Sequence, residues 1–328
     1  MNYRDISAES DPYLVISLDF ELFWGVRDVT SLKKYGKNIL GVRDAVPGLL
    51  KLFNTYGVKA TWAVVGLATF ENKKQILSNL PFDRPLYLNQ QFDPYQHLSV
   101  VGDNEKNDPY HFGYSLVRSI QDTPGMEIAS HTFSHFYCLE PRENYAAWGA
   151  DLQASLTTFG RLGIQPSSIV FPRNQYDDTH LRTASDFGFR TFRGNEKGFL
   201  YEPRSYSENT IHRRVKRLLD AYFDLTGPHL SQALMDDSGL INIPSSRFLR
   251  PCGARLFEEL RFRRVQEQMH NAAISGAGFH LWWHPHNFGV NLPQNLRFLS
   301  RVLEYFSYLK GKYGMKSLTM AEAGGQNY

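Results

Sequence analysis

The sequence predicts a single α/β domain, residues 1–328, built on a parallel sheet. Short apolar segments rich in β-branched residues alternate along the chain with segments of helical periodicity, which is the signature of βαβ units. The chain has 328 residues, 42% of them hydrophobic, which is enough for one large core and fits an α/β barrel with insertions.

The first βαβ unit lies close to the start of the chain. Residues 13–18 form an apolar run typical of a strand buried on both faces. Residues 46–56 have apolar side chains at helical spacing and stop at Gly57, a residue suited to a helix end. Residues 58–66 then predict the second strand.

The same alternation continues to the end of the chain. The later predicted strands are residues 126–130, 168–171, 188–192, 278–283 and 316–319, and the later predicted helices are residues 146–162, 179–187 and 296–313. Residues 70–123 and 195–255 interrupt the pattern, apart from one helical piece at about 212–225. We expect these two stretches to be long loop insertions in the one domain.

Composition and charge disfavour several classes of protein. A net charge of +3 makes nucleic acid a poor default partner, because binding to its backbone needs a concentrated basic face. The basic run at 212–217 could hold a phosphate or a lipid headgroup, although a solvated helix face is its commoner meaning. No signal peptide and no membrane-spanning run is visible, so we expect a soluble cytoplasmic protein.

Polar residues with catalytic potential follow the predicted strands. In α/β barrels and open parallel sheets, functional residues gather at the carboxyl ends of the strands. The residues in this position are Asp19, Glu21, His131, His135, Arg173, Asn174, His284 and His286.

The carboxylates and histidines of this set suggest a metal site. His131 and His135 would share one face of a helical turn. Burying the two like charges of Asp19 and Glu21 costs free energy unless a cation or a proton neutralises them. Two histidines and one carboxylate suit an ion of the zinc type. Alternatively, these histidines start a helix and these carboxylates serve only as turn and cap residues. His284 could be a general acid near neutral pH.

These motifs resemble the polysaccharide deacetylases with a NodB-type domain (carbohydrate esterase family 4). The H-[ST]-x-x-H motif is matched by residues 131–135, the L-x-x-H motif by residues 281–284, and residues 46–66 look like the segment that follows the first motif. The first motif, usually T-F-D-D-G, departs: residues 17–21 read S-L-D-F-E, similar to a D-x-D arrangement in the branch that deformylates lipid-linked aminosugars. The arginine motif is also altered, because Arg173 is displaced within residues 171–176.

The resemblance implies a fold and a set of roles. The fold is an irregular (β/α)7-type barrel. Asp19 would be the general base, His284 the general acid, and Arg173 the residue that orients the base carboxylate. A divalent metal, for which we expect zinc, would be held by Glu21, His131 and His135. An exchange of roles between Asp19 and Glu21 stays open, and cobalt, nickel and manganese accept the same ligands.

The implied activity is metal-dependent removal of an acetyl or formyl group from the nitrogen of an amino sugar. We expect the substrate to be a sugar precursor, free or linked to a lipid or a nucleotide, in surface polysaccharide biosynthesis. Three alternatives stay open: an amidase that acts on a non-sugar amide, a catalytically inactive relative that only binds carbohydrate, and a nucleic-acid binder that uses the basic run at 212–217.

Overall fold

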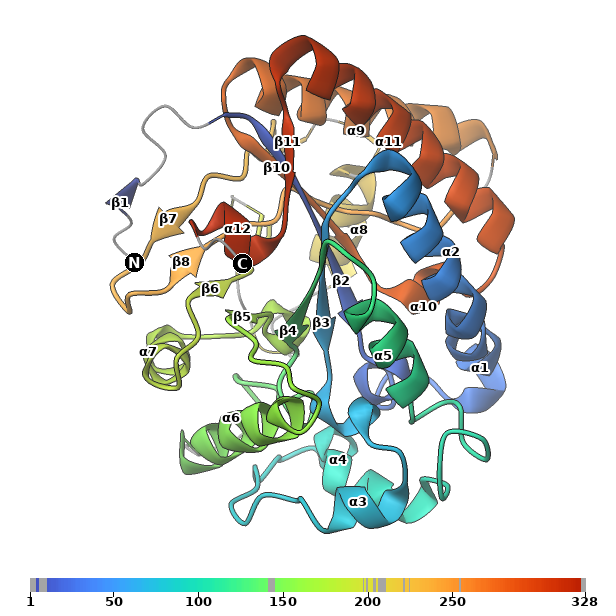
Figure 1. Cartoon of the computed structure of the whole chain (residues 1–328), viewed down its shortest axis with the longest axis vertical. Helices are drawn as coiled ribbons and strands as arrows, with labels where there is room; N and C mark the ends of the chain where they lie inside the picture. The colour runs from blue at the N-terminus through green and yellow to red at the C-terminus, as the bar shows by residue number, and fades with distance from the viewer. Residues whose placement is uncertain are drawn as a thin grey trace.

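A curled, mostly parallel sheet occupies the centre of the molecule as a half-barrel with helices around its outside (Figure 1). The computed structural model describes residues 4–5, 11–140, 145–196, 198, 200–202, 205, 211–220, 222–223, 225–253 and 255–325. The strand order is β1-β7-β8-β6-β5-β4-β3-β2-β10-β9, with β11 also paired to β2. Among the described strands, β7 is antiparallel to β1 and β8, and the other pairings are parallel.

The strands are short except for those at the centre of the sheet. They are β1 (Arg4–Asp5), β2 (Tyr13–Phe20), β3 (Ala60–Val64), β4 (Met126–Ser130), β5 (Ser168–Ile169), β6 (Thr191–Phe192), β7 (Leu234–Met235), β8 (Ile241–Asn242), β9 (Arg247–Phe248), β10 (Gly278–Trp283) and β11 (Lys316–Leu318). Every residue of β2 is buried, as expected of a strand covered on both faces.

The helices surround the sheet. They are α1 (Leu32–Leu40), α2 (Val42–Tyr56), α3 (Lys73–Leu77), α4 (Pro94–His97), α5 (Tyr114–Gln121), α6 (Tyr145–Gly160), α7 (Asp178–Asp186), α8 (Ile211–Asp220), α9 (Arg255–Ile274), α10 (Pro285–Phe288), α11 (Leu292–Tyr313) and α12 (Met320–Ala323). Helix α11 contacts both α2 and α9, and α9 contacts β2 and β10 (Figure 1). Among the described residues, no helix is both long enough and apolar enough to cross a bilayer.

The predicted alternation of strands and helices is confirmed, and β4 and β10 have the predicted bounds. The prediction that residues 70–123 form a loop is wrong in part, because they contain α5, whose apolar residues are buried beside β4. Residues 195–255 are likewise not only loop, because β8 and β9 extend the sheet. Helix α9 was not predicted from the sequence.

Candidate active site

The carboxylates at the end of β2 are both buried, with Asp19 3% and Glu21 4% exposed. Glu21 directly precedes a short 3-10 helix, Leu22–Gly25, and its side chain packs onto the last residue of that helix. A Cβ atom on Gly25 would lie 2.0 Å from the carboxyl carbon of Glu21. Residue 25 must therefore be glycine if the Glu21 carboxylate is to keep this position.

His131 and His135 lie in a loop and not on the helical turn that the sequence predicted. The turn is excluded by left-handed backbone at Thr132 (φ 64°) and His135 (φ 59°). The loop is held from below by Asp151 of α6, whose carboxylate accepts hydrogen bonds from the backbone N–H groups of Phe133 (2.7 Å) and Ser134 (3.1 Å). The two imidazoles converge through this loop and not through helical periodicity.

Glu21, His131 and His135 form a buried group whose ligand atoms all lie within 4.8 Å of one another. Oε2 of Glu21 lies 3.1 Å from Nε2 of His135 and 3.5 Å from Nε2 of His131. Nδ1 of His131 donates to the carbonyl of Val170 at 2.8 Å, which leaves Nε2 as the ring nitrogen that faces Glu21.

The protonation of this group also suits a divalent metal. Burial lowers the pKa of His135 to about 4, so the imidazole is neutral and able to act as a ligand at pH 7. Burial raises the pKa of Glu21, but the surrounding histidines outweigh this effect, and the pKa lies well below its ordinary value. Two imidazoles and one carboxylate are a set of ligands that zinc and similar ions accept.

The arginine that contacts Asp19 is Arg193 and not Arg173. Both terminal nitrogens of Arg193 donate to the Asp19 carboxylate, each at 2.7 Å. Burial raises the pKa of Asp19, but the opposing effects are larger, first among them the charge of Arg193, and the pKa lies below its ordinary value. Arg193 also donates to Ser17 at 3.0 Å, and Ser17 is hydrogen-bonded to His280 at 2.8 Å. Asp19 is therefore ionised and held in one orientation.

Arg173, the sequence-predicted partner of Asp19, is engaged elsewhere. Its guanidinium forms an ion pair with Asp28 and lies 4.1 Å from the ring centre of Tyr137. The expectation that Arg173 orients the carboxylate of Asp19 is corrected by these contacts, because Arg193 occupies that position. Arg173 still lines the same cavity.

His284 faces the two carboxylates from the end of β10. Its Nε2 lies 3.7 Å from Oδ2 of Asp19 and 3.7 Å from Oε1 of Glu21. Its Nδ1 lies 3.2 Å from Oδ1 of Asn287, an acceptor toward which Nδ1 donates, so that Nε2 is the nitrogen that faces the carboxylates. The ring stacks on His286, with 4.8 Å between ring centres. His284 is 22% exposed and so can reach a bound substrate.

His286 is a further neighbour of Glu21 to which the sequence assigned no role. Its Nδ1 lies 3.8 Å from Oε1 of Glu21, and burial lowers its pKa to about 3. His286 is therefore neutral at pH 7.

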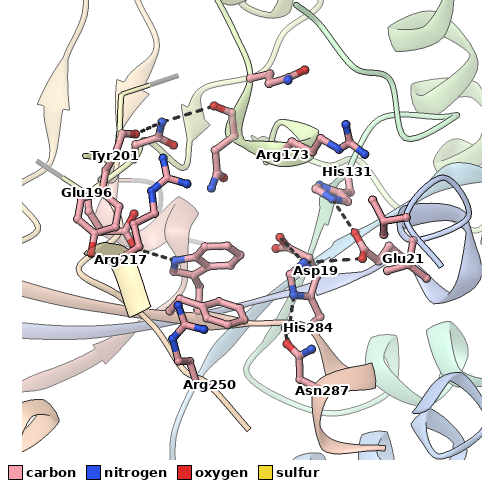
Figure 2. Close-up of a pocket in the computed structure, with 18 of the residues that line it drawn as sticks. Asp19, Glu21, His131, Arg173, Glu196, Tyr201, Arg217, Arg250, His284 and Asn287 are labelled. Carbon is pink, nitrogen blue, oxygen red and sulfur yellow. Dashed lines mark hydrogen bonds and ion pairs between the residues drawn. The ribbon is translucent and has the colours of Figure 1, made fainter. Parts of the chain in front are cut away.

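These residues line one end of a cavity of about 750 Å³. Figure 2 shows Asp19, Glu21, His131 and His284 on one side, with Glu196, Tyr201, Arg217 and Arg250 on the opposite side. Trp282 lines the cavity as well, and its indole N–H donates to Glu196 at 3.2 Å. The cavity is thus long enough to hold a ligand that extends well beyond the group of histidines and carboxylates.

All six sequence-predicted site residues line this cavity: Asp19, Glu21, His131, His135, Arg173 and His284. The important residue that the sequence analysis missed is Arg193. A usable signal existed, because Arg193 directly follows the predicted strand 188–192, the position that singled out the other residues.

Comparison with known proteins gives one family match. A family model described as polysaccharide deacetylase matches residues 36–192. The matched range includes His131, His135 and Arg173, while Asp19, Glu21, Arg193 and His284 lie outside it. No curated protein matches the chain by sequence.

Solved structures share the fold over almost the whole chain. A candidate polysaccharide deacetylase from Mycobacterium smegmatis has a TM-score of 0.61 at 12% identity, covering 99% of this chain and 93% of that one. A candidate polysaccharide deacetylase from Pseudomonas aeruginosa has a TM-score of 0.56 at 13% identity, covering 99% and 94%. The PuuE allantoinase has a TM-score of 0.57 at 11% identity, covering 99% and 93%. At these identities the likeness shows the fold alone.

The motif resemblance is confirmed by the family model: residues 36–192 of this chain match the model of the polysaccharide deacetylase family.

Proposed function

We propose that the protein is a metal-dependent hydrolase that removes an acetyl or formyl group from the nitrogen of an amino sugar. The observation that carries the proposal is the Glu21–His131–His135 group, which lies in one cavity with the Asp19–Arg193 pair and with His284. A ligand set, an oriented carboxylate and a partly exposed imidazole are together the parts that amide hydrolysis requires.

Glu21, His131 and His135 are the residues that would hold the metal, for which zinc is our expectation. A divalent ion bound there supplies Lewis acidity toward an amide carbonyl and toward water. The support is the donor set itself: the group is buried, His135 is neutral, and His131 is fixed by the Val170 carbonyl.

Asp19 acts as the general base. Its carboxylate is ionised and held by Arg193, so it can accept the proton of a water molecule that attacks the carbonyl carbon. We assign this role to Asp19 and not to Glu21 because Glu21 lies closer to Nε2 of His131 and His135.

His284 acts as the general acid. Its Nε2 faces the carboxylates, and Asn287 fixes the other ring nitrogen. As the carbon–nitrogen bond breaks, protonated Nε2 gives its proton to the departing amine. The products are a free amine on the sugar and acetate or formate.

The cavity supports a sugar as the substrate. Trp282, Phe248 and Tyr201 line it, and the rings of Trp282 and Phe248 lie beside His284. Aromatic faces of this kind pack well against the apolar faces of sugar rings. We propose a sugar precursor of a surface polysaccharide, linked to a lipid or a nucleotide and modified in the cytoplasm.

The test is product analysis with purified, metal-loaded protein. N-acetyl and N-formyl amino sugars, free and linked to lipid or nucleotide, are incubated beside small cyclic amides, and released acetate and formate are quantified. We expect release from at least one sugar and none from the Asp19→Asn variant. Turnover of the cyclic amides alone would favour the amidase alternative. Sugar binding without release would favour the inactive relative.

A further inference from the structure

Helix α8, residues Ile211–Asp220, has its polar and apolar faces in the reverse of the usual arrangement. Its inward side chains are polar: Nε of Arg217 donates to the carbonyl of Leu200 at 2.8 Å, and Asp220, 1% exposed, accepts from the hydroxyl of Tyr201 at 2.8 Å. A surface helix of a globular domain normally turns its apolar side inward.

The outward side chains of α8 are apolar. Val215 is 49%, Leu218 43% and Leu219 44% exposed. Residues three and four apart in a helix share one face, so these side chains form a single stripe. We call this stripe, with Phe223 (51% exposed) and Leu225 (54% exposed), the α8 apolar face.

The α8 apolar face continues toward α9. The ring of Tyr222 lies 5.6 Å from the ring of Phe257, which is itself 44% exposed. Contiguous apolar surface that remains exposed in a folded chain marks an interaction site.

The charges on α8 indicate the kind of partner. The sequence of the helix contains His212, Arg213, Arg214, Lys216 and Arg217 and a single carboxylate, Asp220, which is buried. His212 and Lys216 are exposed beside the apolar stripe. An apolar face with a basic border is the composition of helices that lie in the interface of a bilayer containing anionic lipids.

We propose that the α8 apolar face docks on the surface of an anionic lipid bilayer. Val215, Leu218 and Leu219 enter the boundary between headgroups and acyl chains, and Lys216 contacts the anionic headgroups. A second copy of the chain fits this face less well, because two-fold pairing of α8 would bring the basic side chains of both helices together.

The position of α8 gives the docking a consequence for the substrate. Arg217, on the inner side of the helix, lines the catalytic cavity, which Figure 2 shows beside this residue. The cavity wall would then lie about one helix diameter, roughly 10 Å, from the bilayer surface. A sugar attached to a lipid could enter without leaving the membrane. This consequence rests on the proposed function, whereas the docking does not.

The test is sedimentation of the full chain with vesicles of phosphatidylcholine and with vesicles of phosphatidylcholine mixed with phosphatidylglycerol. We expect binding to the mixed vesicles, weakened by salt, and little binding to the neutral ones. The double variant Leu218→Asp, Leu219→Asp should bind the mixed vesicles at least about tenfold more weakly, because it lacks two leucine side chains that docking would bury in the bilayer. The matched control is Leu77→Asp, which changes a leucine on α3 that is somewhat more exposed (53%) than Leu218 and Leu219; this variant should bind the mixed vesicles as the wild type does.

Circular dichroism and release of the acyl group from a soluble sugar show whether the double variant is folded and active. Equal vesicle binding by the wild type and the folded double variant would overturn the proposal, as would a failure of the wild type to bind. If the wild type is a dimer and the double variant is a monomer, the α8 apolar face binds a second copy of the chain and not a bilayer. Loss of vesicle binding with normal activity on the soluble sugar separates the docking from the reaction.

Discussion

The two walls of the catalytic cavity are built in different ways. Asp19, Glu21, His131 and His284 lie at or just after the ends of central strands, and the first three are almost completely buried. The opposite wall comes from residues 195–255, which interrupt the alternation of strands and helices, and it includes Tyr201, Arg217 and Arg250. Groups that follow central strands are held more precisely than groups on loops, while the sequence of the opposite wall can change without disturbing them.

This difference separates the residues that we propose for catalysis from those that we propose for substrate selection. Under the proposed function, the strand-end wall would supply the chemistry, because its groups are fixed by the sheet and by hydrogen bonds beneath them. The opposite wall, which we call the α8 wall, would supply the contacts that select the substrate. Substitutions on the first wall should therefore reduce kcat or metal affinity, and those on the second should raise KM.

The largest expected effect comes from Arg193. Arg193→Ala should lower kcat by about 10²–10⁴-fold, because Asp19 would lose both hydrogen bonds that orient it, while bound metal remains. Arg173→Ala should cost much less, since Arg173 contacts Asp28. Steady-state kinetics and metal content of both variants measure this. A larger loss in Arg173→Ala would return the orienting role to Arg173.

The next effect concerns the packing of Glu21. Gly25→Ala should weaken metal binding by about 10–100-fold, because the new methyl group would occupy the position of the Glu21 carboxylate. Gly311→Ala is the control, since a Cβ atom on Gly311 meets no atom within 4 Å. Competition with a metal chelator gives both affinities. Equal metal affinities of the two variants would show that metal binding does not depend on the present position of the Glu21 carboxylate.

A smaller effect should appear on the α8 wall. Arg250 lines the cavity and is partly exposed there. If it contributes a charged hydrogen bond to substrate binding, Arg250→Ala should raise KM by about tenfold and leave kcat and metal content unchanged. A fall in kcat with constant KM would break the distinction between the two walls.

The smallest effect concerns the support below the strand-end wall. Burial raises the pKa of Asp151 to about 7, although Ser134 and the backbone of Phe133 donate hydrogen bonds to it. A folded pKa above the unfolded value means that the folded chain binds the extra proton, so this contribution to stability is lost as pH rises from about 4 to about 7. Asp151→Asn removes the dependence. The melting temperature of the wild type minus that of the variant should therefore be larger at pH 5 than at pH 8, and a constant difference would contradict this.

The strand-end wall could largely be predicted from the sequence because its residues directly follow apolar strands. Its geometry could not be predicted in full. The loop that brings His131 and His135 together depends on Asp151, which is distant in the sequence. The link between Asp19 and Arg193 likewise depends on the curl of the sheet, which brings the ends of β2 and β6 to one cavity.

The α8 wall and α9 escaped prediction for a related reason. The buried face of helix α9 mixes the apolar residues Phe262, Val265 and Met269 with the polar residues Arg261, Arg264 and Gln268, so the periodicity of its sequence is weak. Helix α8 turns its apolar residues outward. Its sequence pattern therefore predicts a helix, but it also predicts that the apolar side packs on the core, whereas the polar side does so. Periodicity identifies the buried face only when that face is apolar.

The most direct test of the central claim is elemental analysis of the purified protein beside its Glu21→Ala and His131→Ala variants, each reconstituted with zinc and then desalted. We predict about one metal ion per chain in the wild type and loss of that ion in both folded variants, because each removes one of three ligands. A wild type that retains no metal, or variants that keep it, would contradict the assignment of Glu21, His131 and His135 as the metal site.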